Sequence, residues 1–217
     1  MAKFLKYEDF VDPKRREKYD AITIFDVDDT LTVTKSKIKV YDKKTKESFD
    51  LTPAQFNEFE KSDNHEMDFS DFSDLEILKA GKIIEGVFNE LKRTMKSGRR
   101  VGIITARDDG DLIFKFLQHH NVIVNPNYIF AINDPKLPFK GNIAEKKKQA
   151  FYELIRMGFK DFIFYDDDLE NIKLANSITK EIKDSSDKFY QGYYGSSSST
   201  NNISIDSDYG SVTLFKN

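Results

Sequence analysis

Residues 21–31 read AITIFDVDDTL. The apolar run ends in Asp26, and two further carboxylates, Asp28 and Asp29, follow it closely. A short, almost continuous apolar run is typical of a strand buried on both faces of a parallel sheet. Ending such a strand in three acids costs repulsion and desolvation, which a divalent cation would offset. The stretch therefore predicts a buried strand leading into a site for a hard cation with oxygen ligands.

Two more apolar stretches end in reactive polar groups. Residues 101–104 (VGII) lead into Thr105, and residues 162–165 (FIFY) lead into three consecutive acids that begin at Asp166. In an open parallel sheet the carboxyl ends of the strands form one edge, where ligands bind. We therefore expect these polar groups to meet Asp26, although they lie far from it in the sequence.

The order of these motifs is informative. A strand followed by DxDxTL, a second strand ending in threonine, a lysine, and a third strand followed by DDxxxN occur here in succession. This order resembles the haloacid dehalogenase superfamily of phosphohydrolases, over residues 21–32 and 75–175. The resemblance implies an α/β fold, a Rossmann-like three-layer sandwich with a mostly parallel central sheet and a small cap inserted after the first strand. It also implies Mg²⁺-dependent hydrolysis of phosphate monoesters.

The resemblance further implies a role for each residue. Asp26 is the nucleophile that forms an aspartyl-phosphate, and Asp28 protonates the leaving oxygen and then deprotonates the attacking water. Thr105 hydrogen-bonds a phosphoryl oxygen. Asp26, a backbone carbonyl near Asp28 and Asp166 hold Mg²⁺, with Asp167 as a neighbouring ligand.

Some of these assignments stay open at this point. Sequence does not fix which acid in the run Asp166, Asp167 and Asp168 touches the metal, and Asn171 is a further neighbour. Asp29 and Thr30 are expected to orient the loop around Asp28.

The catalytic lysine follows from a helix pattern. Ala150, Phe151 and Leu154 recur at helical spacing, and counting back three, four and seven positions from them reaches Lys147 each time. Lys147 is therefore expected to face the core.

Two neighbouring lysines remain alternatives. Asn142 followed by Glu145 is typical of a helix start, which puts Lys147 just past the first turn. Lys146 is expected on the solvated face, and Lys140 precedes the helix, but either could replace Lys147.

Composition limits the surroundings of this site. The chain has 217 residues, with 34 basic and 37 acidic residues and a net charge of −3. This balance gives no global basic field for nucleic acid. The absence of cysteine excludes disulfides and thiol chemistry, and no apolar stretch approaches the length of a membrane span. We therefore expect a soluble, cytoplasmic protein with no membrane and no obligate protein partner.

The gaps between motifs predict the organisation of the chain. Residues 1–20 are expected to form an N-terminal helical extension, and residues 21–32 and 75–185 the catalytic core. Residues 33–74 exceed what a strand-to-helix connection needs and are expected to form the cap. Residues 186–217 are rich in Ser, Asn and Gly and are expected to be flexible, apart from a terminal hairpin of residues 189–194 with 212–215.

Within the cap, alternation predicts a hairpin. Pairing Val40 with Phe49, and Ile38 with Leu51, places the four apolar side chains on one face. Further elements are expected as follows: a short helix from Thr52, a short strand over 67–72, helices over about 74–96 and 111–120, and at least one strand within 121–133.

Basic side chains near the motifs allow two interpretations each. Lys35, Lys37 and Lys39 share the polar face of the hairpin, where they would recruit a phosphorylated substrate or simply face solvent; we favour the second. Arg107 would touch substrate or pair with a nearby acid.

The substrate stays open. The layout, with LTPAQFN at residues 51–57, is similar to small phage-encoded phosphatase-like proteins and distantly to the phosphatase domain of polynucleotide kinases. A phosphorylated small molecule, such as a nucleotide or a sugar phosphate, or a phosphorylated nucleic-acid end is the expected substrate. A phosphotransferase or phosphomutase of the same family and a non-catalytic binding protein are the alternatives.

Overall fold

The computed structural model describes residues 20–185, 193–195, 202–207 and 210–215. The helical extension expected over residues 1–20 lies, except for Asp20, outside the described residues.

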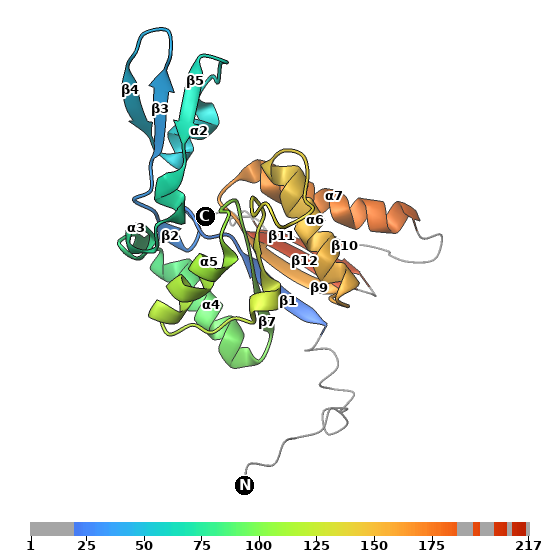
Figure 1. The fold of residues 1–217 in the computed structure, drawn as a ribbon. Helices are drawn as coiled ribbons and strands as arrows, with labels where there is room; N and C mark the ends of the chain where they lie inside the picture. Colours follow the sequence, from blue (N-terminus) through green and yellow to red (C-terminus); the bar gives the residue numbers. More distant parts are fainter. Residues whose placement is uncertain (1–19, 186–192, 196–201, 208–209, 216–217) are drawn as a thin grey trace.

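The first apolar run forms the middle of the main sheet. β1 (Ala21–Phe25) lies between β9 (Asp161–Tyr165) and β7 (Arg100–Thr105), and β8 (Ile129–Ala131) lies beyond β7 (Figure 1). These four strands are parallel, so their carboxyl ends lie at one edge. All five residues of β1 are buried, as expected for a strand covered on both faces.

Helices cover both faces of this sheet. α4 (Glu85–Ser97) and α5 (Gly110–His119) contribute buried apolar residues to the core on one face. α6 (Ile143–Arg156) and α7 (Leu169–Ser185) do the same on the other. The predicted α/β fold, with a mostly parallel sheet between two layers of helices, is confirmed.

The segment after β1 forms a small sheet of its own. β3 (Ile38–Asp42) lies between β4 (Ser48–Leu51) and β5 (His65–Asp68). The predicted pairing is confirmed, because Val40 lies opposite Phe49 and Ile38 opposite Leu51. This sheet projects from the core at the carboxyl edge of the main sheet, together with α2 (Pro53–Glu58) (Figure 1). We call residues 33–74 the cap.

The helix predicted over about 74–96 is wrong in one respect, because it is interrupted. The chain forms α3 (Leu75–Lys79), then β6 (Lys82–Ile83), which pairs with β2 (Thr32–Val33), and only then α4. Gly81 explains the break. A Cβ at this position would lie 2.5 Å from Thr32 Oγ1, so the close approach of β2 tolerates only glycine without a shift.

The strand predicted over 67–72 is also shorter than expected. It ends at Asp68, whose carboxylate accepts a hydrogen bond from the Ser70 amide at 2.8 Å. This local bond starts a turn, and residues Ser70–Ser73 form a short 3-10 helix, η2. The helix at 110–119 and the strand at 129–131, which a short 3-10 helix η3 (Pro126–Tyr128) precedes, agree with the prediction.

The described part of the C-terminal segment contains strands, including one over residues 202–207, where a flexible segment was expected. β11 (Asn202–Ser207) pairs with β10 (Tyr193–Gly195) and with β12 (Gly210–Phe215), and β12 runs parallel to β9. Residues 193 and 194, which were expected to pair with 212–215, pair with β11 instead, and residues 189–192 lie outside the described residues. The serine run at 196–199 lies outside the described residues.

The described helices include none that combines the length and the apolar character that crossing a membrane requires.

Candidate active site

Three neighbouring strands deliver polar side chains to the carboxyl edge of the main sheet. Asp26 follows β1, Asp166 follows β9, and Thr105 ends β7. All three residues are buried. The Asp26 amide also donates to the Tyr165 carbonyl at 2.9 Å, which extends the pairing of β1 with β9 as far as the two aspartates.

The loop after Asp26 turns back on itself. The amides of Leu31 and Thr32 both donate to the Val27 carbonyl, and the Asp29 amide donates to the Thr32 carbonyl at 2.8 Å. Asp29 has a positive φ of 56°, a conformation that Asp tolerates better than most residues. The turn keeps Asp28 beside the strand end.

Three carboxylates form one cluster. Asp26, Asp166 and Asp167 each offer an oxygen atom, and these atoms lie within 4.8 Å of one another. Among the residues that the structure describes, this is the group of acids placed to hold a metal ion. Thr30 fixes Asp167 by two hydrogen bonds, one from its hydroxyl to Oδ1 at 3.2 Å and one that it accepts from the Asp167 amide at 3.1 Å.

Lys147 lies among these carboxylates. Its Nζ is 2.6 Å from Asp166 Oδ2 and 3.1 Å from Asp26 Oδ1. The lysine comes from the second turn of α6, whose start has the predicted capping box of Asn142 and Glu145. The inward orientation expected from helical spacing is what the structure shows, since Lys147 is 3% exposed.

The other lysines have different contacts. Lys146 Nζ donates to Asn133 Oδ1 at 2.7 Å, and the Lys140 amide donates to Gln149. Asp168, the third acid of the run, accepts a hydrogen bond from the Glu170 amide at 2.8 Å at the start of α7. Asn171 donates from Nδ2 to Asp166 at 3.0 Å and holds that carboxylate in place.

The charges in this cluster do not balance. Burial raises the pKa of Asp26 well above its ordinary value, with Lys147 acting in the opposite direction and Asp166 adding to the rise. Burial also raises the pKa of Asp167 to about 6. For Lys147, burial opposes the charged form, but the adjacent Asp166 and Asp26 outweigh it and raise the pKa. Two buried acids and the half-buried Asp167 therefore face one ammonium group.

These residues fit a divalent cation. Asp26 Oδ1 is buried and accepts no hydrogen bond, although it lies within ion-pair distance of Lys147. Carboxylate oxygens are the ligands that Mg²⁺ prefers, and a cation would offset the excess negative charge. Asp26, Asp166 and Asp167 are the residues that would hold it.

The Asp28 carboxylate, expected from the sequence to serve the reaction and to lie near the metal, is not a member of this cluster. It forms a bidentate ion pair with Arg107, from Nε to Oδ2 at 2.9 Å and from Nη2 to Oδ1 at 2.8 Å. The pairing of Arg107 with a nearby acid, one of its two predicted interpretations, is therefore what the structure shows.

Arg107 also has partners that the sequence does not indicate. Its guanidinium donates to the Phe72 carbonyl and lies near the hydroxyls of Thr34 and Ser36, all of which belong to the cap. No local pattern marks these contacts, because they depend on how the cap folds back onto the core.

Lys39 and Lys37 of the cap hairpin both contact Asp71, Lys39 through its ammonium group and Lys37 through its backbone amide. Lys39 Nζ lies 2.8 Å from Asp71 Oδ1, and this hydrogen bond raises the pKa of Lys39. The same carboxylate accepts from the Lys37 amide at 3.1 Å. These contacts agree with the interpretation of the lysines as the solvent-facing side of an amphipathic hairpin.

Comparisons with known proteins add little to this site. No family model matches the chain, and no curated protein matches it. Among solved structures, the chain is similar to a hypothetical protein from Xanthomonas campestris, with 18% identical residues and a TM-score of 0.32 over 73% of this chain. The chain covers 60% of the length of that protein. A likeness this low identifies neither a family nor a function.

Proposed function

We propose that this chain is a Mg²⁺-dependent phosphatase of the haloacid dehalogenase superfamily, which hydrolyses phosphate monoesters through an aspartyl-phosphate on Asp26. The observation that carries the proposal is the position of Lys147 among Asp26, Asp166 and Asp167, at the strand ends where Thr105 also lies. Such a site combines a nucleophile with cationic groups that neutralise a phosphoryl group.

The proposed reaction has two steps. A carboxylate oxygen of Asp26 attacks phosphorus, so an oxygen–phosphorus bond to Asp26 forms while the ester oxygen–phosphorus bond breaks and the leaving oxygen takes a proton from Asp28. Water then attacks the phosphorus of the acyl-phosphate, Asp28 takes the proton from that water, and inorganic phosphate leaves with Asp26 regenerated.

Other side chains bind and orient the phosphoryl group. Lys147 and Thr105 donate hydrogen bonds to phosphoryl oxygens. Asn171 and Thr30 keep Asp166 and Asp167 in position. When bound, Mg²⁺ would neutralise negative charge on the phosphoryl oxygens and so lower the cost of the approach of a carboxylate.

We propose a nucleotide or a short phosphorylated nucleic-acid end as the substrate. Two aromatic side chains of the cap, Phe49 and Phe69, are 39% and 45% exposed. Exposed aromatic rings are suited to stacking on a nucleobase. Because Lys39 is already paired with Asp71, we do not propose an extended contact between the cap and a polynucleotide backbone.

The test is phosphate release from 4-nitrophenyl phosphate and from a panel of nucleotides, sugar phosphates and phosphorylated oligonucleotides, with Mg²⁺ and with a chelator. Asp26→Asn should abolish turnover. Asp161→Asn is the matched control, because Asp161 starts β9 at the opposite end from the site and pairs with Arg99. Activity that survives Asp26→Asn would refute the assignment of the nucleophile.

The same experiment separates the alternatives. Acid-quenched enzyme should carry a phosphoryl label that hydroxylamine removes, as expected for an acyl-phosphate. Transfer of the label to an added alcohol or sugar in preference to water would indicate a phosphotransferase or phosphomutase. A protein that binds nucleotides but forms no acyl-phosphate would be a binding protein.

A further inference from the structure

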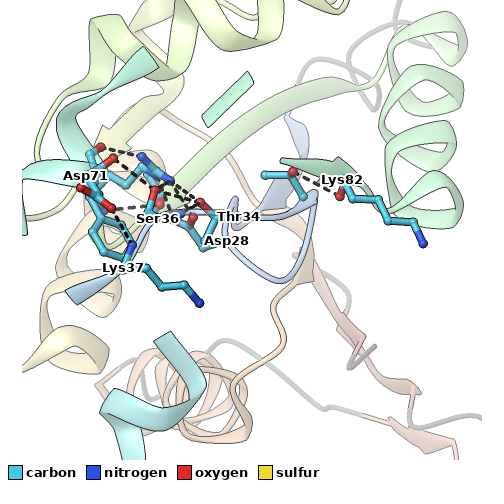
Figure 2. Close-up of polar contacts among 10 residues, drawn as sticks. Asp28, Thr34, Ser36, Lys37, Asp71 and Lys82 are labelled. Carbon is cyan, nitrogen blue, oxygen red and sulfur yellow. Dashed lines mark hydrogen bonds and ion pairs between the residues drawn. The ribbon is translucent and has the colours of Figure 1, made fainter. Parts of the chain in front are cut away.

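Arg107 joins the loop of Asp28 to the cap. It is 2% exposed, and its guanidinium holds both oxygens of the Asp28 carboxylate. The same guanidinium donates from Nη1 to the Phe72 carbonyl and from Nη2 to the hydroxyls of Thr34 and Ser36, at 3.2 and 3.3 Å. Figure 2 shows Asp28, Thr34 and Ser36 side by side, joined by a group of hydrogen bonds.

These partners belong to both connections between the cap and the core. Residues 33–37 are the first residues of the cap after it leaves the core, and residues 69–74 are its last residues before it returns; we call these two segments the cap linkers. Asp71 ties the two linkers together, since its carboxylate accepts from the Lys37 amide and its carbonyl accepts from the Ser36 hydroxyl at 3.1 Å (Figure 2). A change in one linker is therefore transmitted to the other.

One nitrogen of Arg107 serves Asp28 and both linker hydroxyls. Nη2 carries two hydrogens but has three acceptors within 3.3 Å, which are Asp28 Oδ1, Thr34 Oγ1 and Ser36 Oγ. The bidentate pair with Asp28 keeps this nitrogen beside both linker hydroxyls, so loss of that pair would let the guanidinium move away from the linkers. Because the group is buried, water does not readily replace a lost partner.

We propose that Arg107 is a positioning residue that sets the orientation of the Asp28 carboxylate and couples it to the cap linkers. A substrate that moves the cap thereby changes how firmly Asp28 is held, and a change at Asp28 loosens the linkers, because such coupling is reciprocal. The consequence for catalysis rests on the proposed function, whereas the coupling of the linkers to Asp28 does not.

Hydrogen exchange tests the coupling without any turnover. Asp28→Asn and Arg107→Gln should each speed amide exchange of the cap linkers by about tenfold, the factor for loss of a charge-assisted hydrogen bond. Asp161→Asn breaks a comparable bidentate pair with Arg99, with distances of 2.6 and 2.9 Å, at the other end of the sheet. It should leave the linkers unchanged. Linker exchange that is unaffected by Asp28→Asn would overturn the coupling.

Leaving-group dependence tests the positioning of Asp28. 4-Nitrophenolate leaves readily without a proton, whereas the alkoxide of propyl phosphate needs one. The measurement is the single-turnover rate of release of the alcohol or phenol. Arg107→Gln should slow this rate for propyl phosphate at least about tenfold more than for 4-nitrophenyl phosphate. This difference is part of the rate enhancement, roughly 10²–10⁴-fold, that a general acid contributes. Arg107→Lys keeps the charge but lacks the planar fork, so it should not restore the rate.

The outcomes separate the two proposals. Equal slowing of both esters in Arg107→Gln would mean a merely structural role and would overturn the positioning. Absence of Asp26-dependent release from the wild-type protein would refute the proposed function, and with it the catalytic part of this inference. The exchange comparison would then still decide whether Arg107 couples Asp28 to the cap.

Discussion

Asp166 and Asp168 are two residues apart, yet their side chains have different roles. Asp166 is 1% exposed and contacts Lys147, while Asp168 caps the first turn of α7 through the Glu170 amide. The Asp168 amide also donates to Asp166 Oδ1 at 2.9 Å. The backbone between β9 and α7 therefore orients Asp166 toward the site and places Asp168 at the start of the helix, where it caps α7.

This difference predicts which acids bind metal. Asp167→Asn should lower the affinity for Mg²⁺ by at least about tenfold, because it removes a charged oxygen from the cluster. Asp168→Asn should leave the affinity unchanged, because asparagine also caps a helix and the side chain lies outside the cluster. Calorimetric titration with Mg²⁺ measures both, and equal losses in the two variants would contradict the ligand assignment.

A second prediction concerns the buried lysine. Lys147→Met leaves Asp26 and Asp166 without their ammonium partner, and removing one partner of a buried ion pair costs roughly 3–5 kcal/mol. Urea unfolding in a chelator should show a loss near this size, and added Mg²⁺ should recover part of it. Lys146→Met is the control, because Lys146 contacts the neutral Asn133. An unchanged free energy of unfolding in Lys147→Met would refute the charge argument.

At the scale of elements, the end of α5 carries a histidine in an apolar setting. The His120 ring packs against Phe88 and Phe116, and its Nε2 is buried without a hydrogen-bond partner. Burial lowers the pKa of His120 below its ordinary value of 6.5, and the neighbouring His119 and Lys92 add to the effect. The folded protein therefore resists protonation of this ring.

The pH dependence of stability follows from this shift. Below pH 6.5 the unfolded chain binds a proton that the folded chain does not, so the contribution of His120 is full above pH 6.5 and is lost as the pH falls through the folded pKa. His120→Gln should reduce the fall in melting temperature between pH 7.5 and pH 5.5. His119→Gln, on the exposed side, should reduce it less. An identical fall in His120→Gln and wild type would contradict this account.

The junction of α3 and β6 gives a further prediction. Gly81→Ala should destabilise the protein by about 1–3 kcal/mol, because the added methyl meets Thr32 Oγ1 at 2.5 Å and the Leu78 carbonyl at 3.0 Å. Thr32→Ala removes the nearer of these atoms. Chemical denaturation of the double variant should therefore show a smaller loss than the sum of the single variants. Strict additivity would mean that the two residues do not meet.

For the molecule as a whole, the sequence predicts features that depend on local spacing. The inward face of Lys147 follows from helical periodicity, and the pairing of Val40 with Phe49 follows from alternation. The order of strand ends predicts that Asp26 and Asp166 meet, because a parallel sheet aligns its carboxyl edge. Predicting these features requires only the local sequence pattern and the fold class.

Features that depend on contacts between residues far apart in the chain could not be predicted from the sequence. The interruption at Gly81 exists because β2 passes close by, and nothing near residue 81 reveals that. The contacts of Arg107 with Thr34 and Ser36 depend on the return of the cap. The strand over residues 202–207 was not predicted because its composition is polar, although Ile203 and Ile205 alternate with polar residues as in a half-buried strand.

The C-terminal strands give the prediction that concerns the whole sheet. β12 lies between β11 and β9, with Thr213 opposite Ile163 in β9 and Ser204 in β11. Thr213→Pro removes a backbone donor from an interior strand and should cost about 3 kcal/mol, whereas Thr213→Val keeps the donor and the β-branched shape and should cost little. Urea unfolding measures both variants. If both variants unfold as the wild type does, β12 adds nothing to the stability of the sheet, and β9 is the last strand on that side that does.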